Sequence, residues 1–365
     1  MKILIAINHS YMLWQMRKEL IQRLLDYGEV VISTPFVGHE DDFEKMGCRC
    51  VEADFDRHGT NPLQELKLLA YYRRLIRAEK PDLVITYSIK PNIYAGFVCR
   101  LAGIPYCVNI TGLGSAFRHP GVAQAVTVMY RTAVRGARAV LFENEHNAEL
   151  FIKRHIIRPE RKFRVSGAGV NLDEYAPHPY PSEEEGVHFL YLGRIMQDKG
   201  IHEILTAAER LKAECGQKVF FDFVGFFDGE ECRERVEKLD EEGVITFHGF
   251  QTNPRPFYAA CHCVILPSYH EGMSNVLLEA ASSARALITS DIPGCREAVE
   301  EGETGFLIPP ENADALYEAV KRFLSLTPGQ RAQMGIKGRE KMEKEFDRSK
   351  VIEDTLLAFK LCPTE

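Results

Sequence analysis

Short apolar runs alternate with amphipathic stretches of helical length along most of the chain. KILIAI at residues 2–7 is typical of a buried strand, and the stretch after it places Leu13, Leu20 and Leu24 on one face at helical spacing. Apolar runs recur further along, among them EVVIST, PDLVITYS, VHFLYLGR and KVFFDFVG. Because strands that alternate with helices form parallel sheets covered on both faces, the pattern predicts an α/β fold with doubly wound parallel sheets.

A proline-rich stretch without periodicity separates two such regions. Pro177, Pro179 and Pro181 are followed by three acidic residues and Gly186, a composition typical of a linker. With 365 residues, 45% of them hydrophobic, the chain is long enough for two cores. We therefore predict an N-terminal domain at residues 1–178 and a second domain at residues 187–346.

The sequence predicts neither a membrane span nor a metal site. No apolar run approaches the roughly 18–20 residues that a span needs, and Met1 leads directly into the first predicted strand, so we expect a cytoplasmic protein. Its ten cysteines are then expected to be reduced and mostly buried. The cysteine pairs at 48–50 and 261–263 lack zinc spacing, and we interpret Asp54 and Asp56 as polar loop residues.

The formal net charge of −7 is unevenly distributed. Residues 1–175 hold 24 Lys and Arg against 19 Asp and Glu, a net +5, whereas the remainder holds 21 against 33, a net −12. Within residues 117–164, ten basic residues face four acids. This segment is either a solvated face or a surface for anionic lipid, where each basic group contributes on the order of 1 kcal/mol. Nucleic acid is not expected as a partner, because the net charge is negative and no stacking motif is interleaved.

The most informative chemistry lies in a loop that leads into a helix-forming run. Glu271 is followed, after seven residues, by Glu279, and Ser274 or Asn275 between them could cap the helix. Gly272 would let a ligand approach the backbone, and the free amides of a helix N-terminus suit a diphosphate. Two carboxylates beside a phosphate need other partners, which the hydroxyls of a sugar and a ribose would provide. The alternative is that both are solvated surface charges.

Two cations are predicted near that phosphate. Arg194 follows a predicted strand and Gly193, and Lys199 precedes the next predicted helix. Arg binds phosphate oxygens as a planar fork, whereas Lys binds them as a point charge. Because open α/β sheets bind ligands at the carboxyl ends of their strands, we expect both cations to neutralise a diphosphate there.

The segment from Glu271 to Glu279 resembles the E-x7-E signature of the retaining family-4 glycosyltransferases. The sequences ALITSDIPGCREAV and GETGFLIPP that follow also match that family. The resemblance implies the GT-B architecture, in which two Rossmann-like domains face a central cleft. It also implies that a C-terminal helix at residues 347–365 crosses back to the first domain.

The same resemblance implies roles for individual residues. Glu271 would hold donor-sugar hydroxyls and Glu279 the ribose, while Arg194 and Lys199 would bind the donor diphosphate. Arg194, Lys199 and Glu271 are then the predicted catalytic residues. The other predicted donor-binding residues, with Phe250 at the nucleotide base, are Gly193, Phe250, Gly272, Met273, Ser274 and Asn275.

Candidates for the acceptor or sugar side lie in the N-terminal region. His9 occupies the turn after the first strand, which is usually glycine-rich in this fold, and it could contact the sugar or be an ordinary turn residue. Lys90 stands at the expected tip of a strand, where it could bind a phosphate or be a surface lysine. We predict that the next helix starts at Pro91 or Asn92.

A glycine turn at Thr111 and Gly112 follows the next predicted strand. Gly112 and Gly114 suggest a dinucleotide site, but Phe117 stands where the third glycine is required, so NAD(P) is not expected. The amides of the turn could still bind an acceptor phosphate. We expect no cofactor, since the nucleotide-sugar would be a substrate. The predicted residues of the acceptor or sugar side are His9, Lys90, Asn92, Thr111 and Gly112.

Residues 60–117 resemble the branch of the family that builds O-antigen, capsule or glycan precursors on polyprenyl diphosphate carriers. A histidine often found near Asn109 to Thr111 in that family is missing here. The resemblance implies metal-independent retaining transfer of a hexose or N-acetylhexosamine from a nucleotide-diphosphate donor to a lipid-linked saccharide. Our hypothesis for the donor is a UDP-sugar, and we assign no catalytic base. A nucleotide-sugar 2-epimerase and a non-catalytic sugar-binding or phosphate-binding module are the alternatives.

Overall fold

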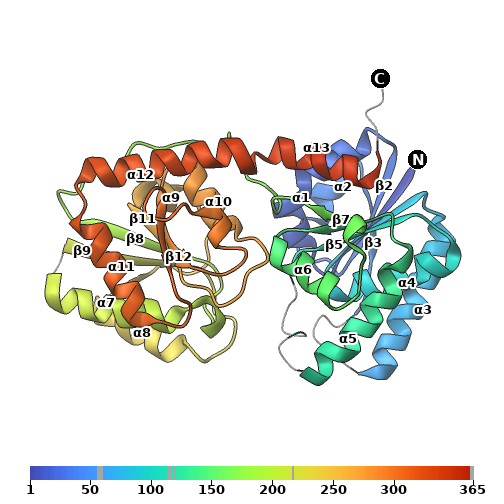
Figure 1. Cartoon of the computed structure of the whole chain (residues 1–365), viewed down its shortest axis with the longest axis horizontal. Helices are drawn as coiled ribbons and strands as arrows, with labels where there is room; N and C mark the ends of the chain where they lie inside the picture. Colours follow the sequence, from blue (N-terminus) through green and yellow to red (C-terminus); the bar gives the residue numbers. More distant parts are fainter. Residues whose placement is uncertain (56–60, 113–116, 118–119, 216–217, 362–365) are drawn as a thin grey trace. The chain divides into compact units, whose positions relative to one another are not determined.

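A parallel sheet of seven strands forms the core of the first part of the chain (Figure 1). The structure is a computed structural model that describes residues 1–55, 61–112, 117, 120–215 and 218–361. The strands lie in the order β3-β2-β1-β4-β5-β6-β7, and every neighbouring pair is parallel. Their bounds are β1 (Lys2–Ala6), β2 (Glu29–Thr34), β3 (Arg49–Glu52), β4 (Leu83–Tyr87), β5 (Tyr106–Ile110), β6 (Ala139–Phe142) and β7 (Lys162–Arg164).

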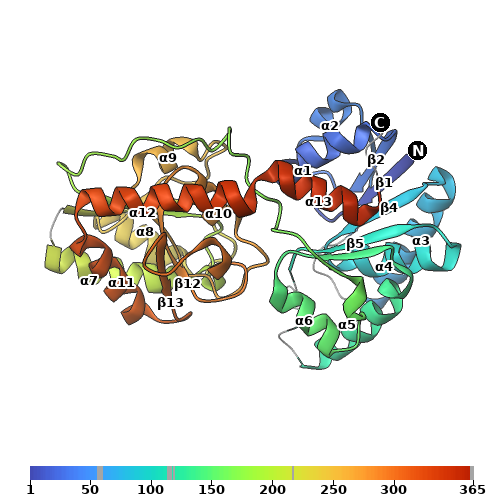
Figure 2. The ribbon, with the colours of Figure 1, turned by 45° about the horizontal axis from the view of Figure 1, so that its top comes forward.

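Alternating side chains of these strands supply two hydrophobic cores, one on each face of the sheet. Ile3 and Ile5 of β1 belong to one core, whereas Leu4 and Ala6 belong to the other. Figure 2 shows α1, α2 and α13 (Arg348–Phe359) on one side of the sheet and α3, α4 and α5 on the other. The helices of this part are α1 (Ser10–Leu25), α2 (Glu40–Met46), α3 (Pro62–Glu79), α4 (Ile89–Ala102), α5 (Pro120–Ala133) and α6 (Glu145–Lys153).

A second parallel sheet has six strands in the order β10-β9-β8-β11-β12-β13. The pattern of this part therefore repeats that of the first, and the predicted fold of two doubly wound parallel sheets is confirmed. The strands are β8 (Val187–Leu192), β9 (Val219–Val224), β10 (Thr246–Phe247), β11 (Cys263–Leu266), β12 (Ala286–Ser290) and β13 (Gly305–Ile308). The helices of this part are α7 (Ile201–Cys215), α8 (Arg233–Glu241), α9 (Arg255–Ala260), α10 (Asn275–Ser282), α11 (Ala313–Ser325) and α12 (Pro328–Lys341).

The chain divides into two compact units whose limits differ from the predicted domain boundaries. Unit 1 comprises residues 1–168 and 351–365, and unit 2 comprises residues 169–350. The second unit begins before the proline-rich linker because hydrogen bonds to the backbone of residues 169–178 hold this segment to it. The amide of Val170 donates to the carbonyl of Phe346 at 2.8 Å, and Arg285 donates to the carbonyl of His178 at 3.2 Å.

Helix α4 begins at Ile89, two residues before the earlier of the two predicted starts. Ser88 precedes it with a φ of 69°, which ends β4 and turns the chain into the helix. Pro91 falls within the first turn, where its missing N–H removes no intrahelical bond. Lys90 is consequently a residue of the first helical turn rather than of the strand tip.

Candidate active site

The carboxyl ends of β8 and β11 bring the predicted cation and carboxylate of unit 2 together. These two strands are neighbours at the point where the strand order reverses, which is where open α/β sheets bind ligands. Lys199 lies in the loop after β8 and Glu271 in the loop after β11, and Lys199 Nζ is 2.5 Å from Glu271 Oε1. Ser268 Oγ also donates to Glu271 Oε1 at 2.9 Å. Both charged side chains are mostly buried, with 16% and 13% of their surface exposed.

Two glycines allow the loops around this pair to pack backbone against backbone. A Cβ at Gly200, where φ is 73°, would lie 2.2 Å from the carbonyl oxygen of Pro267. A Cβ at Gly294, where φ is 89°, would lie 2.5 Å from the carbonyl oxygen of Gly272. Any larger residue at either position would push the loops apart. The separation of Lys199 from Glu271 therefore depends on these close contacts.

The start of α10 follows directly after Glu271. Ser274 occupies the N-cap position, but within the described part of the chain its side chain caps no amide of the helix. Its own amide donates to the carbonyl of Gly294 at 2.8 Å, and Asn275 is the first helical residue. Met273 and Ser274 are buried, so the backbone is the part of this segment that a ligand could meet. The helix N-terminus provides positive potential beside Glu271.

Glu279 lies one turn into α10 and is partly buried. The hydroxyl of Tyr258, a residue of α9, donates to Glu279 Oε2 at 2.8 Å. Burial raises the pKa of Glu279 to about 7, against the opposing effects of the Tyr258 hydrogen bond and the Arg348 charge. Tyr258 is a residue that the sequence analysis missed, because nothing in the local sequence of α9 pairs it with a carboxylate 21 positions away.

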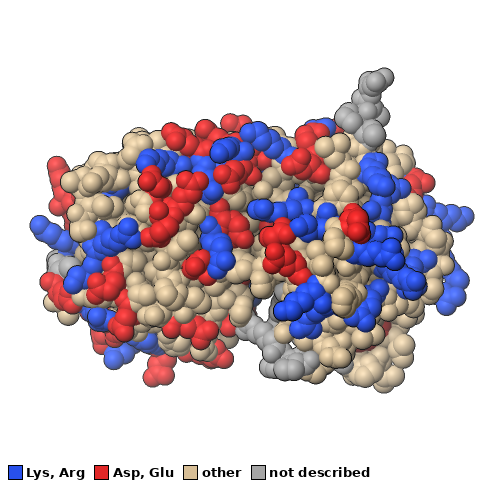
Figure 3. All heavy atoms as spheres, viewed as in Figure 1, with Lys and Arg blue, Asp and Glu red and all other residues tan. Residues whose placement is uncertain are grey.

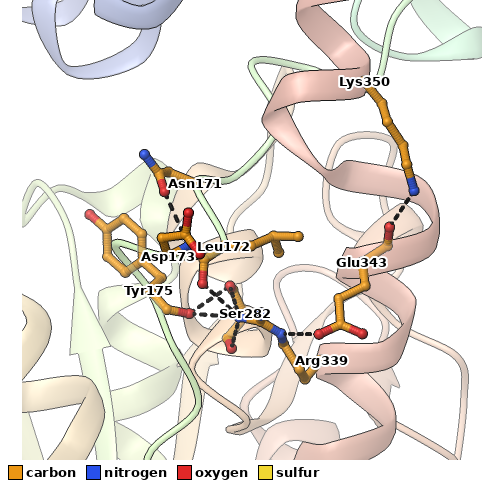
Figure 4. A network of polar contacts seen from close by, with 8 residues as sticks. All are labelled: Asn171, Leu172, Asp173, Tyr175, Ser282, Arg339, Glu343 and Lys350. Atoms are coloured by element: carbon orange, nitrogen blue, oxygen red, sulfur yellow. Dashed lines mark hydrogen bonds and ion pairs between the residues drawn. The ribbon is translucent and has the colours of Figure 1, made fainter.

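The segment before the second sheet is held against this region by Arg339 of α12. Its Nη1 atom donates to the carbonyls of Leu172, Tyr175 and Ser282 at 2.9, 3.1 and 3.1 Å (Figure 4). Its Nε atom donates to Glu343 at 2.7 Å. Arg339 thus connects α12, the last residue of α10 and the segment that contains Tyr175.

Arg194, the other predicted cation, has an acidic partner in unit 2. Its guanidinium binds Asp228, beyond the end of β9, at 2.5 Å, and both side chains are about half exposed. The backbone at Gly193 is nevertheless closely packed, since a Cβ at Gly225 would lie 1.8 Å from the Gly193 carbonyl oxygen. Arg194 therefore stays at the carboxyl end of β8, but its side chain takes a partner that the sequence did not indicate.

Phe250, the predicted base-side residue, lies near the same end of the sheet. It is 51% exposed, and its ring lies 5.9 Å from the ring of Phe226. The preceding Gly249 has a φ of 66°, and its carbonyl accepts from the amide of Gly225 at 2.9 Å. This bond holds the Phe250 segment beside the carboxyl ends of β8 and β9.

In unit 1, the strand order reverses between β1 and β4, and polar residues follow both strands. Ser88 Oγ donates to Asn8 Oδ1 at 2.7 Å, and His9 is the N-cap residue of α1. Lys90 Nζ forms a largely buried ion pair with Glu65 at 2.8 Å. Asn8 and His9 therefore follow the carboxyl end of β1, next to the carboxyl end of β4, and Lys90 has a carboxylate partner.

Asn92, another residue predicted for the acceptor or sugar side, lies inside unit 1. It is 1% exposed, and its amide donates to the carbonyl of Asn109 at 2.9 Å, which joins α4 to β5. Thr111 and Gly112 follow β5 and are partly exposed. Gly114 and Asp56, which figured in the dinucleotide and metal interpretations, lie outside the described residues.

A buried ion pair in unit 1 was not anticipated from the sequence. Arg17 Nη2 lies 2.6 Å from Glu143 Oε1, and the guanidinium also donates to the carbonyl of Gly167 at 3.2 Å. Arg17 lies 5.5 Å from the ring centre of Tyr87. Burial raises the pKa of Glu143 to about 7, with Arg17 acting in the opposite direction. The one available signal was a carboxylate directly after the apolar strand β6.

Two further searches covered only the described part of the chain. Across residues 1–55, 61–112, 117, 120–215 and 218–361, His, Cys, Asp and Glu side chains nowhere gather in threes that could hold a metal ion. None of the helices in these ranges combines the length and the apolar character that crossing a membrane requires.

The chain also matches known proteins over most of its length. The 25% identity to the N,N'-diacetylbacillosaminyl-diphospho-undecaprenol alpha-1,3-N-acetylgalactosaminyltransferase of Campylobacter jejuni extends over 330 residues and covers 86% of each protein. The UDP-Gal:alpha-D-GlcNAc-diphosphoundecaprenol alpha-1,3-galactosyltransferase of Escherichia coli is 28% identical over 280 residues, which cover 71% of this chain and 70% of that protein.

Solved structures share the fold across the whole chain. HepE of Anabaena in complex with UDP and glucose superposes with a TM-score of 0.81 at 18% identity, covering 99% of this chain and 100% of HepE. A glycosyltransferase from Rickettsia africae superposes with a TM-score of 0.80 at 16% identity, covering 98% of each chain. The predicted GT-B fold is thereby confirmed.

Two family models match consecutive parts of the chain. Residues 2–144 match the model described as glycosyl transferase 4-like, and residues 176–341 match the model described as glycosyl transferases group 1. Together they cover every strand of the two sheets except β7, and they include Lys199, Glu271 and Glu279. The chain is therefore a glycosyltransferase that joins a glycosyl transferase 4-like N-terminal region to a group 1 C-terminal region.

Proposed function

We propose that this glycosyltransferase transfers a hexose or N-acetylhexosamine from a UDP-sugar to a hydroxyl of a polyprenyl-diphosphate-linked saccharide, with retention at the anomeric carbon and without a metal ion. The observation that carries the proposal is the contact between Lys199 and Glu271 beside the N-terminus of α10. An ammonium, a carboxylate and the N-terminus of a helix in one place suit a ligand that has both a phosphate and sugar hydroxyls.

The chemistry that these residues support is stabilisation of the leaving group. As the bond to the sugar breaks, negative charge develops on the diphosphate, and Lys199 and the amides at the start of α10 would already be oriented towards it. Arg194 would join them by exchanging Asp228 for a phosphate oxygen. The exchange is inexpensive because an exposed ion pair contributes only about 0–1 kcal/mol.

The two carboxylates would then hold the uncharged parts of the donor. Glu271 would accept hydrogen bonds from hydroxyls of the sugar once the diphosphate attracts Lys199. Glu279 would accept hydrogen bonds from the ribose hydroxyls. The departing phosphate would take the proton of the acceptor, so the proposal requires no protein base. Phe250 would lie on the side of the nucleotide base.

The proposed acceptor class is taken from the relatives. The names of the relatives from Campylobacter jejuni and Escherichia coli describe transfer to saccharides on diphospho-undecaprenol. On the same basis we propose that the basic segment at residues 117–164 binds an anionic membrane surface. Arg131 and Arg161 support the proposed membrane surface. Their guanidinium groups donate to backbone carbonyls, which do not neutralise the positive charge as a carboxylate would.

A donor panel tests the proposal. Purified protein is incubated with UDP-, GDP- and ADP-sugars and with lipid-linked saccharide acceptors, and the products are identified by mass spectrometry and anomeric NMR. We expect acceptor-dependent transfer from a UDP-sugar, with the α-linkage of the donor retained. We also expect Lys199→Ala to lower kcat/KM by about 100-fold or more, whereas Lys238→Ala on α8 should not.

Other outcomes of this experiment contradict the proposal in distinguishable ways. Turnover only with a GDP-sugar contradicts the UDP assignment. Formation of an epimer from the donor alone favours the 2-epimerase. Binding that Lys199→Ala weakens, without transfer to any acceptor, favours a non-catalytic module.

A further inference from the structure

A buried tyrosine from a neighbouring helix donates a hydrogen bond to Glu279. Tyr258 of α9 is fully buried, and its hydroxyl lies 2.8 Å from Glu279 Oε2 and 3.5 Å from the carbonyl of Val276. The single hydrogen of a hydroxyl group can form only one hydrogen bond of good geometry. Of the two acceptors, the Glu279 carboxylate is nearer than the Val276 carbonyl. Burial raises the pKa of Tyr258 well above its ordinary value, so the hydroxyl remains a donor throughout the neutral range.

The other groups that face Glu279 come from two further segments. Tyr175 and Glu174 belong to the segment before the second sheet, and Arg348 belongs to the start of α13. The rings of Tyr175 and Tyr258 meet edge to face, with 5.9 Å between their centres. Because Arg339 binds the carbonyl of Tyr175, the position of this ring is fixed relative to α10 (Figure 4).

We propose that Tyr258 is a positioning residue that keeps Glu279 oriented and ionised, so that this enzyme binds its nucleotide through the ribose most tightly when Glu279 carries a negative charge. The proposal rests on the proposed function, in which Glu279 accepts the ribose hydroxyls. A carboxylate can accept hydrogen bonds from two neighbouring hydroxyls, and those bonds are stronger when the acceptor is charged.

The direction of the pH effect follows from the surroundings of Glu279. Burial raises the pKa of this group to about 7, while Tyr258, Arg348 and Tyr175 favour the charged form and Glu174 disfavours it. Glu279 is therefore protonated below neutrality and ionised above it. The contribution of the ribose hydroxyls to affinity should rise as the pH passes upward through neutrality. Removing the Tyr258 hydroxyl should move this rise to higher pH.

The test compares UDP with 2′,3′-dideoxy-UDP by titration calorimetry over a range of pH. The ratio of the two dissociation constants isolates the ribose hydroxyls, because titration of the phosphates affects both nucleotides alike. For the wild-type protein we expect UDP to bind more tightly by roughly 10-fold or more above neutrality and by much less below it. A ratio that does not change with pH overturns the proposal, and this measurement needs no variant.

Variants then assign the effect to the pair. Glu279→Gln should give a small ratio at every pH, and Tyr258→Phe should move the rise to higher pH while leaving the affinity for dideoxy-UDP unchanged. Tyr317→Phe is the matched control, because Tyr317 also donates to a carboxylate of unit 2, Glu214, but on α11 and α7. If Tyr258 had only a structural role, Tyr258→Phe would weaken the binding of both nucleotides equally. This result would also overturn the proposal.

Failure of this inference can be told apart from failure of the proposed function. If UDP binds and a sugar is transferred, but the ratio of the two dissociation constants changes neither with pH nor in Tyr258→Phe, only the inference about Tyr258 is wrong. If UDP fails to bind and GDP or ADP binds instead, the comparison is repeated with that nucleotide and its dideoxy analogue, with the same expectations. If none of the three binds, the proposed donor site itself is contradicted.

Discussion

Two carboxylates in this protein, Glu143 and Glu279, combine burial with a nearby positive charge, and the balance between these effects sets their protonation. In both cases burial has the larger effect and raises the pKa to about 7. Their partners differ in kind, since Glu143 is held by the Arg17 guanidinium and Glu279 by the Tyr258 hydroxyl. A guanidinium is always charged, whereas a tyrosine hydroxyl contributes only a neutral donor.

The Glu143 carboxylate should make the stability of unit 1 depend on pH. Its folded-state pKa of about 7 exceeds its ordinary value of 4.5, so the folded protein binds this proton more tightly than the unfolded chain. The resulting stability is fully present below the ordinary value and is lost as the pH rises through about 7. Relative to Glu143→Gln, the wild-type free energy of unfolding should fall by about 3 kcal/mol over that interval.

Trp14 makes this measurement specific to unit 1, because it is the one tryptophan of the chain and lies on α1 close to Arg17. Urea unfolding is followed by Trp14 fluorescence at several pH values. Glu149→Gln, which removes an exposed carboxylate of α6, is the control. Its free energy of unfolding should change with pH in parallel with that of the wild type. If the free energy of unfolding of Glu143→Gln also changed with pH in parallel with that of the wild type, the prediction would be contradicted.

At the scale of elements, α12 fixes the segment that follows the crossing between the units. Thr327 and Gln330 form a capping box that begins this helix, and Arg339 near its end binds three carbonyls. Those carbonyls belong to the chain around residues 172–175 and to the last residue of α10. Since α10 carries Glu279, the geometry of the candidate donor site depends on a helix that lies about 60 residues later in the sequence.

Replacing Arg339 should therefore destabilise unit 2. In Arg339→Ala three partly buried carbonyls lose a charged donor, and we expect the free energy of unfolding to fall by about 2–4 kcal/mol. Circular dichroism during urea unfolding measures this change. The control is Lys337→Ala on the same helix, which removes an exposed ion pair with Glu303 and should change stability much less than Arg339→Ala does. Equal losses in the two variants would show that the carbonyl contacts are unimportant.

At the scale of the whole molecule, the charge separates by sequence half, with a net +5 in residues 1–175 and −12 in the remainder. Figure 3 shows Lys and Arg gathered over the part of the surface that belongs to unit 1. Ion pairs neutralise only part of this charge, since Arg131, Arg138 and Arg161 donate to backbone carbonyls. A basic surface of this kind attracts anionic lipid over distances of about a Debye length.

Liposome flotation measures this attraction. We expect the protein to float with vesicles that contain anionic lipid and not with neutral vesicles, and added salt should weaken the association. Replacing the exposed Lys153, Arg158 and Arg164 by Ser should reduce flotation, because each basic group contributes on the order of 1 kcal/mol. The matched control changes three exposed lysines of unit 2, Lys218, Lys238 and Lys344. Equal recovery with neutral and anionic vesicles would contradict the proposed membrane surface.

The sequence was most informative where a feature depends on residues close together in the chain. The apolar run EVVIST coincides with β2, and the loop–helix junction after Glu271 was predicted from its glycine and its helix-forming residues. The start of α4 was predicted two or three residues late, because the left-handed conformation of Ser88 is not visible in its side chain. The sequence did not indicate that Asn92, which we predict on the acceptor or sugar side, is buried and joined to β5 by a hydrogen bond.

The sequence by itself determined the two parallel sheets and the positions of Glu271 and Glu279 relative to α10, because side-chain periodicity and helix initiation are local properties. Only the tertiary structure decided that Lys199 meets Glu271, that Arg194 instead binds Asp228, and that Tyr258 donates to Glu279. These partners lie between 21 and 72 positions apart. The order of the strands in the sheet and the close approach of loops at glycines bring them together, and neither can be read from local spacing.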